Sequence, residues 1–362
     1  MLIFENKKVL ITGGTGSLGK TLVRRILTGE LGTPNKVIVF SRDEAKQHDM
    51  RVSYLHKSVT TDEVIYRNFM NVMEFRIGDV RNYADVCSVI KDADIVINAA
   101  ALKQVPACEY FPTQAILTNC IGAVNITRAI NENNYSIDTV VGISTDKAAK
   151  PINVMGMTKA LQERIFTSAN ILSPNTRFIC VRYGNVLASR GSVIPLFHDQ
   201  IKHGGPVTVT VPEMTRFLLS LDQAVDTVFE ALKYAKRGET YVPNAPSARV
   251  IDIAKGLIGN RKIEIKVTGI RPGEKMHEIM ISDEEANHCV KRGNYFAIRA
   301  MLPELFNDCD NEKNALTKEF SSADTVLDLV GTIGLLKKHQ LLLDDDLGII
   351  EAAAAMEEEL LR

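Results

Sequence analysis

The stretch KVLITGGTGSLG, residues 8–19, decides the fold of this chain. An apolar run typical of a strand leads into a glycine-rich turn with GxxGxxG spacing, and a helical pattern begins at Ser17. Glycines at this spacing allow a tight turn and bring backbone N–H groups close to a pyrophosphate at the helix N-terminus. Because the motif lies between a strand and a helix, we expect a dinucleotide-binding turn. Its predicted contacts are Gly13, Thr15, Gly16, Ser17, Leu18 and Gly19.

Apolar runs alternate with helical patterns through the first two thirds of the chain, as in a parallel sheet with crossover helices. Further strands are predicted at 36–40, 74–77, 93–98, 139–143 and 178–182, and helices at 112–132 and 154–169. Beyond residue 185 the elements become shorter. We therefore predict an α/β protein with a Rossmann-type doubly wound sheet in residues 1–185, to which later segments can return. A smaller α+β substrate-binding cap is expected at 186–335, and an acidic C-terminal helix at 336–362.

Composition narrows the range of partners. The 362 residues carry a formal net charge of −1, which offers no basic field for nucleic acid or an anionic membrane. The seven histidines and six cysteines show no metal-binding spacing, so we expect no metal site. The N-terminus does not resemble a signal peptide, and no apolar stretch reaches the roughly 18 residues of a spanning helix. These features favour a cytoplasmic location.

The residues after the second and third strands predict which dinucleotide binds. Chains that bind NAD usually place an acidic residue after the second strand, whereas this chain has Ser41 and Arg42. A guanidinium suits a 2′-phosphate, which favours NADP. The alternative is that Arg42 is a surface charge and Asp43 or Glu44 binds the ribose. Further cofactor contacts are expected from Asp79, Val80, Ala99, Ala100 and Ala101.

The segment STDKAAKPINVMGMTK, residues 144–159, follows the fifth strand. It resembles the extended short-chain dehydrogenase/reductase superfamily, in which a Ser or Thr after this strand is followed by Tyr-x-x-x-Lys. Lys159 stands at the lysine position, which implies contact with the nicotinamide ribose. Met155 stands at the tyrosine position, and a thioether cannot exchange a proton. Either catalysis has been lost, or Asp146 and Lys147 supply an acid/base pair instead.

Longer motifs resemble the UDP-N-acetylglucosamine 4,6-dehydratase family, one subset of which carries this methionine. They are STDKA, MGxTK, ALKQVP at 101–106, RYGNV at 182–186, ASRGSVIP at 188–195, MTRF at 214–217 and GIRPGEK at 269–275. That family usually carries a segment with serine and asparagine late in the chain, and residues 319–325 resemble a remnant of it. The resemblance implies a lyase with tightly bound, recycled NADP, or less favourably NAD. It also implies a UDP-4-keto-6-deoxy-N-acetylhexosamine product, with inversion at C5, for surface glycan synthesis.

The resemblance also implies roles for individual residues. Lys147 would be the base at sugar C5 and Asp146 the acid at the C6 hydroxyl, although the reverse assignment is open. Thr145 or Ser144, with Lys159, would polarise the C4 oxygen, and Lys147 or a water would deprotonate the C4 hydroxyl. An arginine in the substrate set could instead form a structural ion pair, and Lys103 could be a solvated lysine. The expected contacts to the UDP-sugar are Lys103, Asn185, Arg190, Ser192, Val193, Arg216, Arg271 and Glu274.

Two alternatives to a dehydratase stay open. A UDP-N-acetylhexosamine 4-epimerase shares the scaffold and the oxidation at C4, but it normally needs the missing tyrosine. A non-enzymatic NADP-sensing protein would explain Met155 but not the motifs expected to bind a diphosphate. The superfamily commonly pairs through two helices, one of them the helix that carries Met155 and Lys159, so we expect a homo-oligomer.

Overall fold

The chain forms two compact units in the computed structural model, which describes residues 2–55, 63–187, 192–305 and 312–343. The larger unit comprises Met1–Tyr183, Asp222–Asn244 and Met280–Glu319. The smaller unit comprises Gly184–Leu221, Ala245–Ile279 and Phe320–Arg362. The first segment of the larger unit ends at Tyr183, and two later segments return to this unit.

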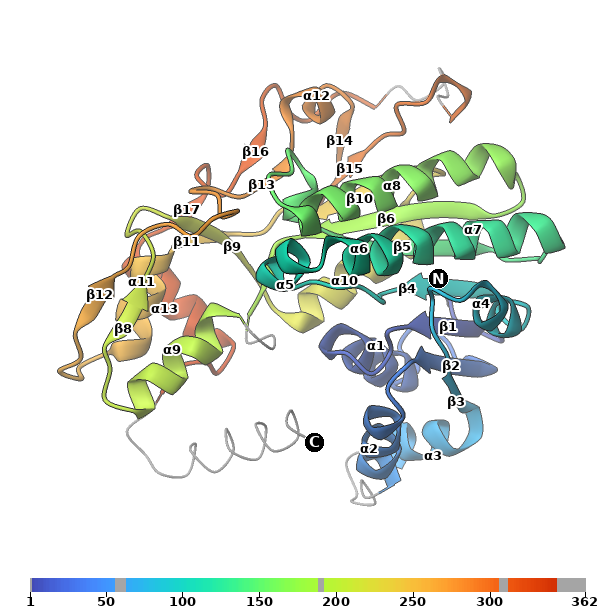
Figure 1. Cartoon of the computed structure of the whole chain (residues 1–362), viewed down its shortest axis with the longest axis horizontal. Helices are drawn as coiled ribbons and strands as arrows, with labels where there is room; N and C mark the ends of the chain where they lie inside the picture. The colour runs from blue at the N-terminus through green and yellow to red at the C-terminus, as the bar shows by residue number, and fades with distance from the viewer. Residues whose placement is uncertain (1, 56–62, 188–191, 306–311, 344–362) are drawn as a thin grey trace. The chain divides into compact units, whose positions relative to one another are not determined.

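The larger unit is built on a single mixed sheet (Figure 1). Within the described residues the sheet has nine strands in the order β14-β15-β10-β6-β5-β4-β1-β2-β3. The strands from β10 to β3 run parallel, and β15 and β14 continue one edge antiparallel. Their bounds are β1 Lys8–Thr12, β2 Lys36–Ser41, β3 Met73–Ile77, β4 Ile95–Asn98, β5 Thr139–Thr145, β6 Arg177–Tyr183, β10 Thr240–Pro243, β14 Cys289–Arg292 and β15 Tyr295–Ile298. The predicted Rossmann-type α/β fold is confirmed.

The order of the parallel strands locates the ligand-binding edge. β1 lies between β2 and β4, and the chain moves outward from β1 in opposite directions on its two sides. In doubly wound sheets, ligands bind at the carboxyl ends of the strands where the order reverses. This point lies between the ends of β1 and β4, where the glycine-rich turn begins.

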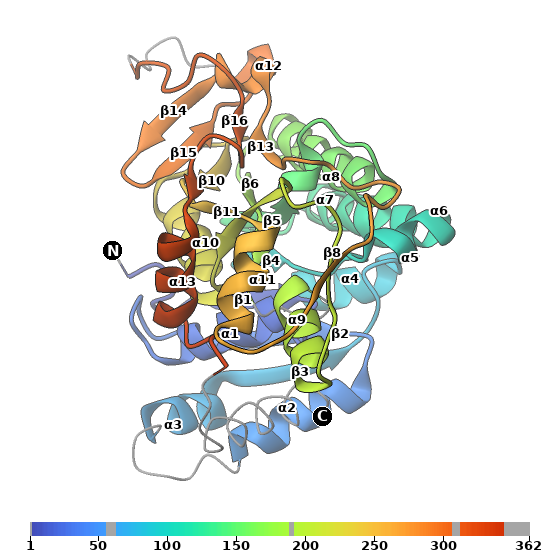
Figure 2. The ribbon, with the colours of Figure 1, turned by 90° about the vertical axis from the view of Figure 1, so that its left-hand side faces the viewer.

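Helices cover both faces of this sheet (Figures 1 and 2). On one face, α4, α7 and α8 pack in succession against a core that contains Leu10, Phe40, Val140 and Phe178. Because side chains alternate along a strand, Val9 and its equivalents point to the opposite face, where α1 and α10 lie. The helices of this unit are α1 Ser17–Leu27, α2 Glu44–Leu55, α3 Glu63–Val72, α4 Tyr83–Ile90, α5 Val105–Tyr110, α6 Pro112–Ala115, α7 Gly122–Asn133, α8 Val154–Leu172, α10 Leu221–Tyr234 and α12 Asp283–Ala286. Short turns of other helix types lie at η1 Ile116–Ile121, η2 Asp146–Ala148 and η3 Pro303–Leu305.

Most elements begin and end within two residues of their predicted bounds, and the first helix begins at Ser17 as predicted. The helix predicted at 112–132 is present, but it is not α-helical throughout. It consists of α6, the π-helical turn η1 and α7. Within η1, the fully buried amide of Asn119 bonds to both backbone groups of Leu102 and to the hydroxyl of Thr158. These partners come from distant segments, so the local apolar pattern does not reveal the change in helix type.

The smaller unit contains a four-stranded sheet in the order β17-β11-β9-β7 and the parallel pair β12-β8, among the residues described. Helices α9 Val193–Lys202, α11 Val250–Ile258 and α13 Leu329–Lys338 surround its apolar core. Its strands are β7 Asn185–Val186, β8 Val207–Val209, β9 Thr215–Leu219, β11 Ser247–Arg249, β12 Ile265–Val267 and β17 Val326–Leu327, and β13 Ile279–Ile281 and β16 Phe320–Ser321 lie at segment borders.

Most of the acidic helix expected at 336–362 falls on residues 344–362, which lie outside the described residues. No helix in the described ranges is long and apolar enough to cross a bilayer.

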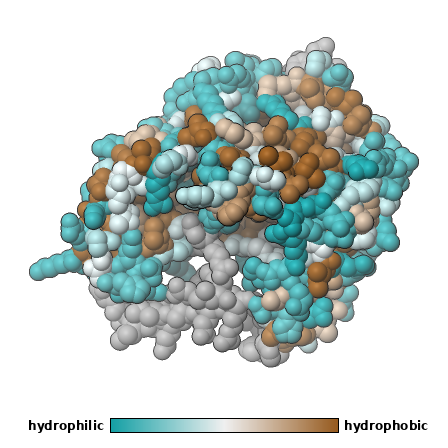
Figure 3. Space-filling view, viewed as in Figure 1, coloured by the Kyte–Doolittle hydropathy of each residue, from teal (hydrophilic) through white to brown (hydrophobic). Residues whose placement is uncertain are grey.

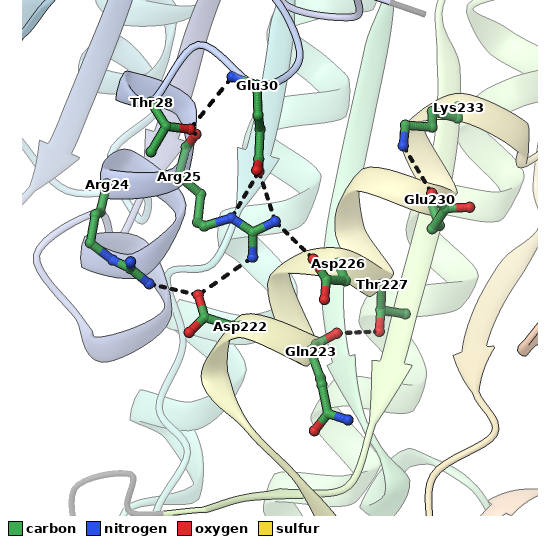
Figure 4. A network of polar contacts seen from close by, with 10 residues as sticks. All are labelled: Arg24, Arg25, Thr28, Glu30, Asp222, Gln223, Asp226, Thr227, Glu230 and Lys233. Atoms are coloured by element: carbon green, nitrogen blue, oxygen red, sulfur yellow. Dashed lines mark hydrogen bonds and ion pairs between the residues drawn. The ribbon is translucent and has the colours of Figure 1, made fainter. Parts of the chain in front are cut away.

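A cluster of charged residues fastens α1 to α10 in the larger unit (Figure 4). The Arg25 guanidinium pairs with Asp226 at 2.8 Å and Glu30 at 2.7 Å, and it lies over the ring of Phe229. Asp222 bonds to both Arg24 and Arg25. These contacts line a hollow of about 330 Å³, whose charged groups largely pair with one another. The cluster therefore orients the helix that follows the glycine-rich turn.

Candidate active site

The glycine-rich turn packs directly on the segment after β4. Gly13 has a φ of +65°, and a Cβ placed there would lie 2.8 Å from the backbone nitrogen and Cα of Ala100. A Cβ on Gly19 would lie 2.5 Å from the carbonyl oxygen of Gly14. Both positions thus require glycine, which permits the close backbone approach that a dinucleotide pyrophosphate needs. Gly16 caps α1 without a side-chain hydrogen bond, which leaves the first N–H groups of α1 suited to phosphate oxygens.

Two buried polar side chains that the sequence reasoning missed fix this junction. The Thr12 hydroxyl donates to Asn98 Oδ1 at 2.6 Å and accepts from the backbone N–H of Ala100 at 3.2 Å. These bonds hold the ends of β1 and β4 together, with Ala99, Ala100 and Ala101 beside the turn. Polar residues at the ends of two apolar strands were the available signal. The residues present fit a bound nicotinamide dinucleotide.

The loop after β2 contains the residues predicted to bind the ribose of the dinucleotide or its 2′-phosphate. Gln47, which is buried, donates to the hydroxyl and carbonyl oxygens of Ser41 and to the carbonyl of Arg76. Arg42 is half-exposed, and its guanidinium lies 3.6 Å from the carboxylate of Asp79. Burial raises the pKa of Asp79, but hydrogen bonds and charge from Arg81 and the charge of Arg42 outweigh this and lower it overall. Arg42 therefore sits beside an anionic group in a solvent-accessible position.

The Asp146 and Lys147 pair lies at the carboxyl end of β5. Asp146 is fully buried, and its Oδ1 accepts from the Thr145 hydroxyl at 2.8 Å and from Lys147 Nζ at 3.0 Å. Thr145 caps the short turn η2 by accepting from the backbone N–H of Lys147. The Lys147 side chain is 21% exposed, so it lies between a buried carboxylate and solvent. The predicted acid/base pair is thus a hydrogen-bonded pair in the structure.

Two polar atoms beside this pair lack a hydrogen-bond partner within the described residues. They are Ser144 Oγ and Asp146 Oδ2, both buried. Unsatisfied buried polar atoms are uncommon in folded proteins, and they are expected where a ligand or water completes the site. Their position at the carboxyl end of a central strand agrees with the ligand-binding edge of the sheet.

Lys159 lies inside the larger unit rather than at its surface. Its ammonium donates to the carbonyl of Ile143 at 2.6 Å and to Gln162 Oε1 at 2.8 Å. Burial lowers the pKa of Lys159 to about 8, although the nearby Cys180, Glu163 and Cys120 act in the opposite direction. In this structure the ammonium thus bonds to protein groups on β5 and α8, beside the predicted cofactor site.

Met155 packs in an apolar cluster with Cys108 and Ala115 and is 6% exposed. Its neighbour Gly156 allows the start of α8 to lie against the turn η2, because a Cβ there would be 2.3 Å from the carbonyl oxygen of Lys147. Asn153 caps the helix by accepting from the backbone N–H of Gly156. The Met-Gly pair therefore supplies packing and close approach, not proton transfer.

The predicted substrate residues fall into several environments. Lys103 is exposed in the larger unit, and Arg190 lies outside the described residues. In the smaller unit, Ser192 Oγ and Glu274 Oε2 are buried without a hydrogen-bond partner within the described part of the chain. The remaining positions there are Asn185 on β7, Val193 at the start of α9 and the exposed Arg271.

Arg216 is buried, and its guanidinium is largely occupied by groups of its own unit. It donates to the carbonyls of Thr215 and Met276 and to the sulfur of Met214, and it lies 3.8 Å from the carboxylate of Glu278. Within the segment 319–325, the buried Ser322 hydroxyl bonds to Thr215 and to the backbone N–H of Glu278. This part of the predicted site therefore has a structural network of its own.

A search for relatives places the chain in a family. The profile of the polysaccharide biosynthesis proteins matches residues 9–300. The chain belongs to this family. A relative from Rickettsia bellii, strain OSU 85-389, named UDP-glucose 4-epimerase, is 44% identical over 301 residues, which cover 82% of this chain and 84% of the relative.

Two solved structures are similar to this chain in fold. The protein Pen from Bacillus thuringiensis is 34% identical, with a TM-score of 0.83 over 94% of this chain and 99% of Pen. The dTDP-glucose 4,6-dehydratase DesIV from Streptomyces venezuelae, solved with NAD and TYD bound, is 17% identical, with a TM-score of 0.62 over 74% and 86% of the two chains. At this identity DesIV supports the fold alone.

The comparisons correct the reaction class expected from the sequence. The lyase classification is wrong, because the curated relatives of the family at 41–44% identity are named UDP-glucose 4-epimerases, which are isomerases. The motifs did not separate the two classes, because an epimerase shares the scaffold and the oxidation at C4 with a dehydratase. No group of three His, Cys, Asp or Glu side chains within the described residues could hold a metal ion.

Proposed function

We propose that this chain is a nicotinamide-dependent 4-epimerase of a UDP-hexose, with UDP-glucose or UDP-N-acetylglucosamine as substrate and glycan synthesis as its context. The observation that carries the proposal is the 44% identity to a UDP-glucose 4-epimerase over 82% of the chain. The hydrogen-bonded Asp146–Lys147 pair supports it, because epimerisation at C4 needs a group that removes and returns the proton of the C4 hydroxyl. Met155 cannot do this.

A bound nicotinamide dinucleotide would supply the acceptor and donor of hydride for sugar C4. Lys147 takes the proton of the C4 hydroxyl and gives it back in the reverse step. Asp146 fixes the amine through its 3.0 Å hydrogen bond and stabilises the charged form of Lys147. Ser144 Oγ, buried and unpartnered among the described residues, donates to the C4 oxygen as negative charge develops. Lys159 keeps this region electropositive and would contact the ribose of a bound nicotinamide dinucleotide.

The nucleotide end of the substrate needs several polar contacts. We assign donors to it from Asn185, Arg190, Ser192 and Arg271, with Glu274 accepting from a ribose hydroxyl and Val193 in apolar contact. We assign Lys103 to the sugar. The unpartnered atoms Ser192 Oγ and Glu274 Oε2 support this assignment. Arg216 supports the nucleotide site indirectly, because its guanidinium donates to the backbone carbonyls of Thr215 and Met276. Exposed Arg271 has a planar guanidinium suited to a diphosphate.

Proton NMR of the nucleotide sugar tests the proposal. UDP-glucose and UDP-N-acetylglucosamine are incubated separately with the protein and cofactor in deuterated water. An epimerase gives the C4 epimer, seen in the ring coupling constants, with unchanged mass and no deuterium at C5. A product that has lost one water and carries a C6 methyl group would overturn the proposal. Tight binding of the sugar without any product would also overturn it and favour the sensor.

We further propose NADP rather than NAD, with Ser41 and Arg42 at the 2′-phosphate. Arg42→Ala is expected to weaken NADPH binding by about 10- to 100-fold and to leave NADH binding unchanged, because a charge-assisted hydrogen bond contributes about 1.5–3 kcal/mol. Fluorescence titration of both cofactors checks this. Lys46→Ala, which removes a neighbouring exposed cation paired with Asp43, is the control. Equal losses for both cofactors in the Arg42 variant would contradict the assignment.

A homo-oligomer is proposed through the outer face of α8. Met157, Leu161 and Leu172 are 48%, 55% and 68% exposed, and α8 lies beside α7 and η1. Figure 3 shows hydrophobic side chains gathered over this region of the larger unit. Exposed apolar stripes on helices are typical of protein interfaces. Light scattering is expected to give a mass of at least two chains, whereas a monomer at micromolar concentration would contradict the proposal.

A further inference from the structure

Gln162 is a fully buried amide one turn after Lys159 on α8. Its Oε1 accepts from Lys159 Nζ at 2.8 Å, and its Nε2 donates to the carbonyl of Ile143 at 3.0 Å. The Lys159 ammonium donates to the same carbonyl at 2.6 Å. The three groups therefore form a closed ring of hydrogen bonds between α8 and β5.

The chemistry of the ring dictates the orientation of the amide. An ammonium has only donors and a carbonyl has only acceptors. If the amide were flipped, its NH₂ group would face the ammonium and its oxygen would face the Ile143 carbonyl, so both contacts would be repulsive. Gln162 can therefore satisfy both neighbours in one orientation only, which fixes the position of Lys159 Nζ. An apolar side chain at this position would fill the volume but could not do this.

We propose that Gln162 is a positioning residue that holds the Lys159 ammonium at the end of β5 and keeps it protonated. The ring supplies two neutral acceptors, Ile143 O and Gln162 Oε1, which offset the loss of water around the charge. A neutral acceptor stabilises the ammonium without forming an ion pair. The role of Lys159 at the cofactor rests on the proposed epimerase function, whereas the ring of hydrogen bonds does not.

The titration of Lys159 follows from all groups that face it. Burial lowers its pKa, while Cys180 on β6, Glu163 on α8 and Cys120 on η1 raise it, for a net value of about 8. Removing the Gln162 oxygen withdraws support from the charged form and lowers the pKa further. Placing a carboxylate there adds an opposite charge and raises it. Substitutions at one position thus shift the titration in opposite directions, which a packing role alone would not produce.

The test is an NMR titration of the full chain without cofactor, labelled with ¹³C at lysine Cε and assigned with Lys159→Arg. Gln162→Met is expected to lower the Lys159 midpoint by about one pH unit, and Gln162→Glu to raise it by about one unit or more. Gln47→Met is the matched control, because it removes another buried glutamine and should leave the midpoint unchanged. Shifts in the same direction, or no shift in either variant, would overturn the proposal.

A second measurement uses the wild-type chain and so does not depend on any variant folding. The side-chain amide signals of Gln162 should move with the same midpoint as Lys159, because the amide oxygen bonds to the titrating group. Amide signals that do not respond would overturn the proposal. Since both titrations are made without cofactor, they succeed or fail independently of the NMR assay for epimerisation.

Discussion

Lys147→Met is expected to lower kcat for epimerisation by about 10²- to 10⁴-fold, the range typical for loss of a general acid/base. The substitution removes the amine that exchanges the proton of the C4 hydroxyl, and Met155 provides no substitute. Dinucleotide affinity should stay within about two- to threefold of wild type, because the glycine-rich turn and the loop after β2 are untouched. Single-turnover kinetics and cofactor titration separate the two effects.

A matched control lies three residues further along the same loop. Lys150→Met removes another lysine, whose ammonium pairs with Asp283 and Glu319 at 2.6 Å rather than with Asp146. We expect its kcat to stay near that of wild type. The double variant Asp146→Asn with Lys147→Met should lose no more than the worse single variant, because the two residues act as a unit. A Lys147 variant that retains kcat and changes only KM would place Lys147 in substrate binding.

Arg182→Met is expected to lower the free energy of unfolding by about 3–5 kcal/mol, the usual penalty for breaking a buried ion pair. Arg182 is 2% exposed and forms bidentate contacts with Glu163 on α8 and Glu285 on α12. The variant leaves both carboxylates buried without a cation. Urea unfolding at neutral pH measures the loss, and the exposed Arg164→Met on the same helix serves as the control, with a change within about 0.5 kcal/mol.

The pH dependence of this loss distinguishes charge from packing. Burial would raise the pKa of Glu285, but Arg182 outweighs burial and lowers it from 4.5 to about 2. In wild type this contribution to stability is complete above pH 4.5 and disappears as the pH falls towards 2. In the variant, the buried carboxylate binds a proton more readily, so acid relieves the penalty. The difference in stability should therefore narrow as the pH falls from neutrality towards 2. A difference independent of pH would contradict the ionic explanation.

Several features of the candidate site depend on local spacing in the sequence. The glycine turn, the strand ends and the position of Lys159 follow from patterns only a few residues long. The burial of Asp146 and its 3.0 Å bond to Lys147 agree with the adjacent acid/base pair that the motif indicated. The sheet edge at which ligands are expected could also be inferred from the sequence, because the strand order of a doubly wound sheet is strongly constrained.

Contacts between distant segments could not be predicted in this way. Arg182 bonds to Glu285, 103 residues away, and the motif around Arg182 carries no sign of that partner. The sequence suggested that Arg216 grips the substrate, whereas its donors mainly bond within the smaller unit. The role of Gln162 was missed because a single polar residue in an otherwise mixed helix has no recognisable pattern. The burial of Gln162 indicates its role, and burial is known only once the fold is known.

The returning segments of the larger unit affect how the protein is made. The chain passes between the two units at 183–184, 221–222, 244–245, 279–280 and 319–320. A ribosome that has released only the first 183 residues has provided β1 to β6, but not β10, β15 and β14 at the adjacent edge. Until those strands emerge, the outer edge of β6 has unpaired backbone groups, which are a template for association with other chains. Completion of the sheet is therefore coupled to synthesis of most of the polypeptide, and the smaller unit is assembled from segments interleaved with it.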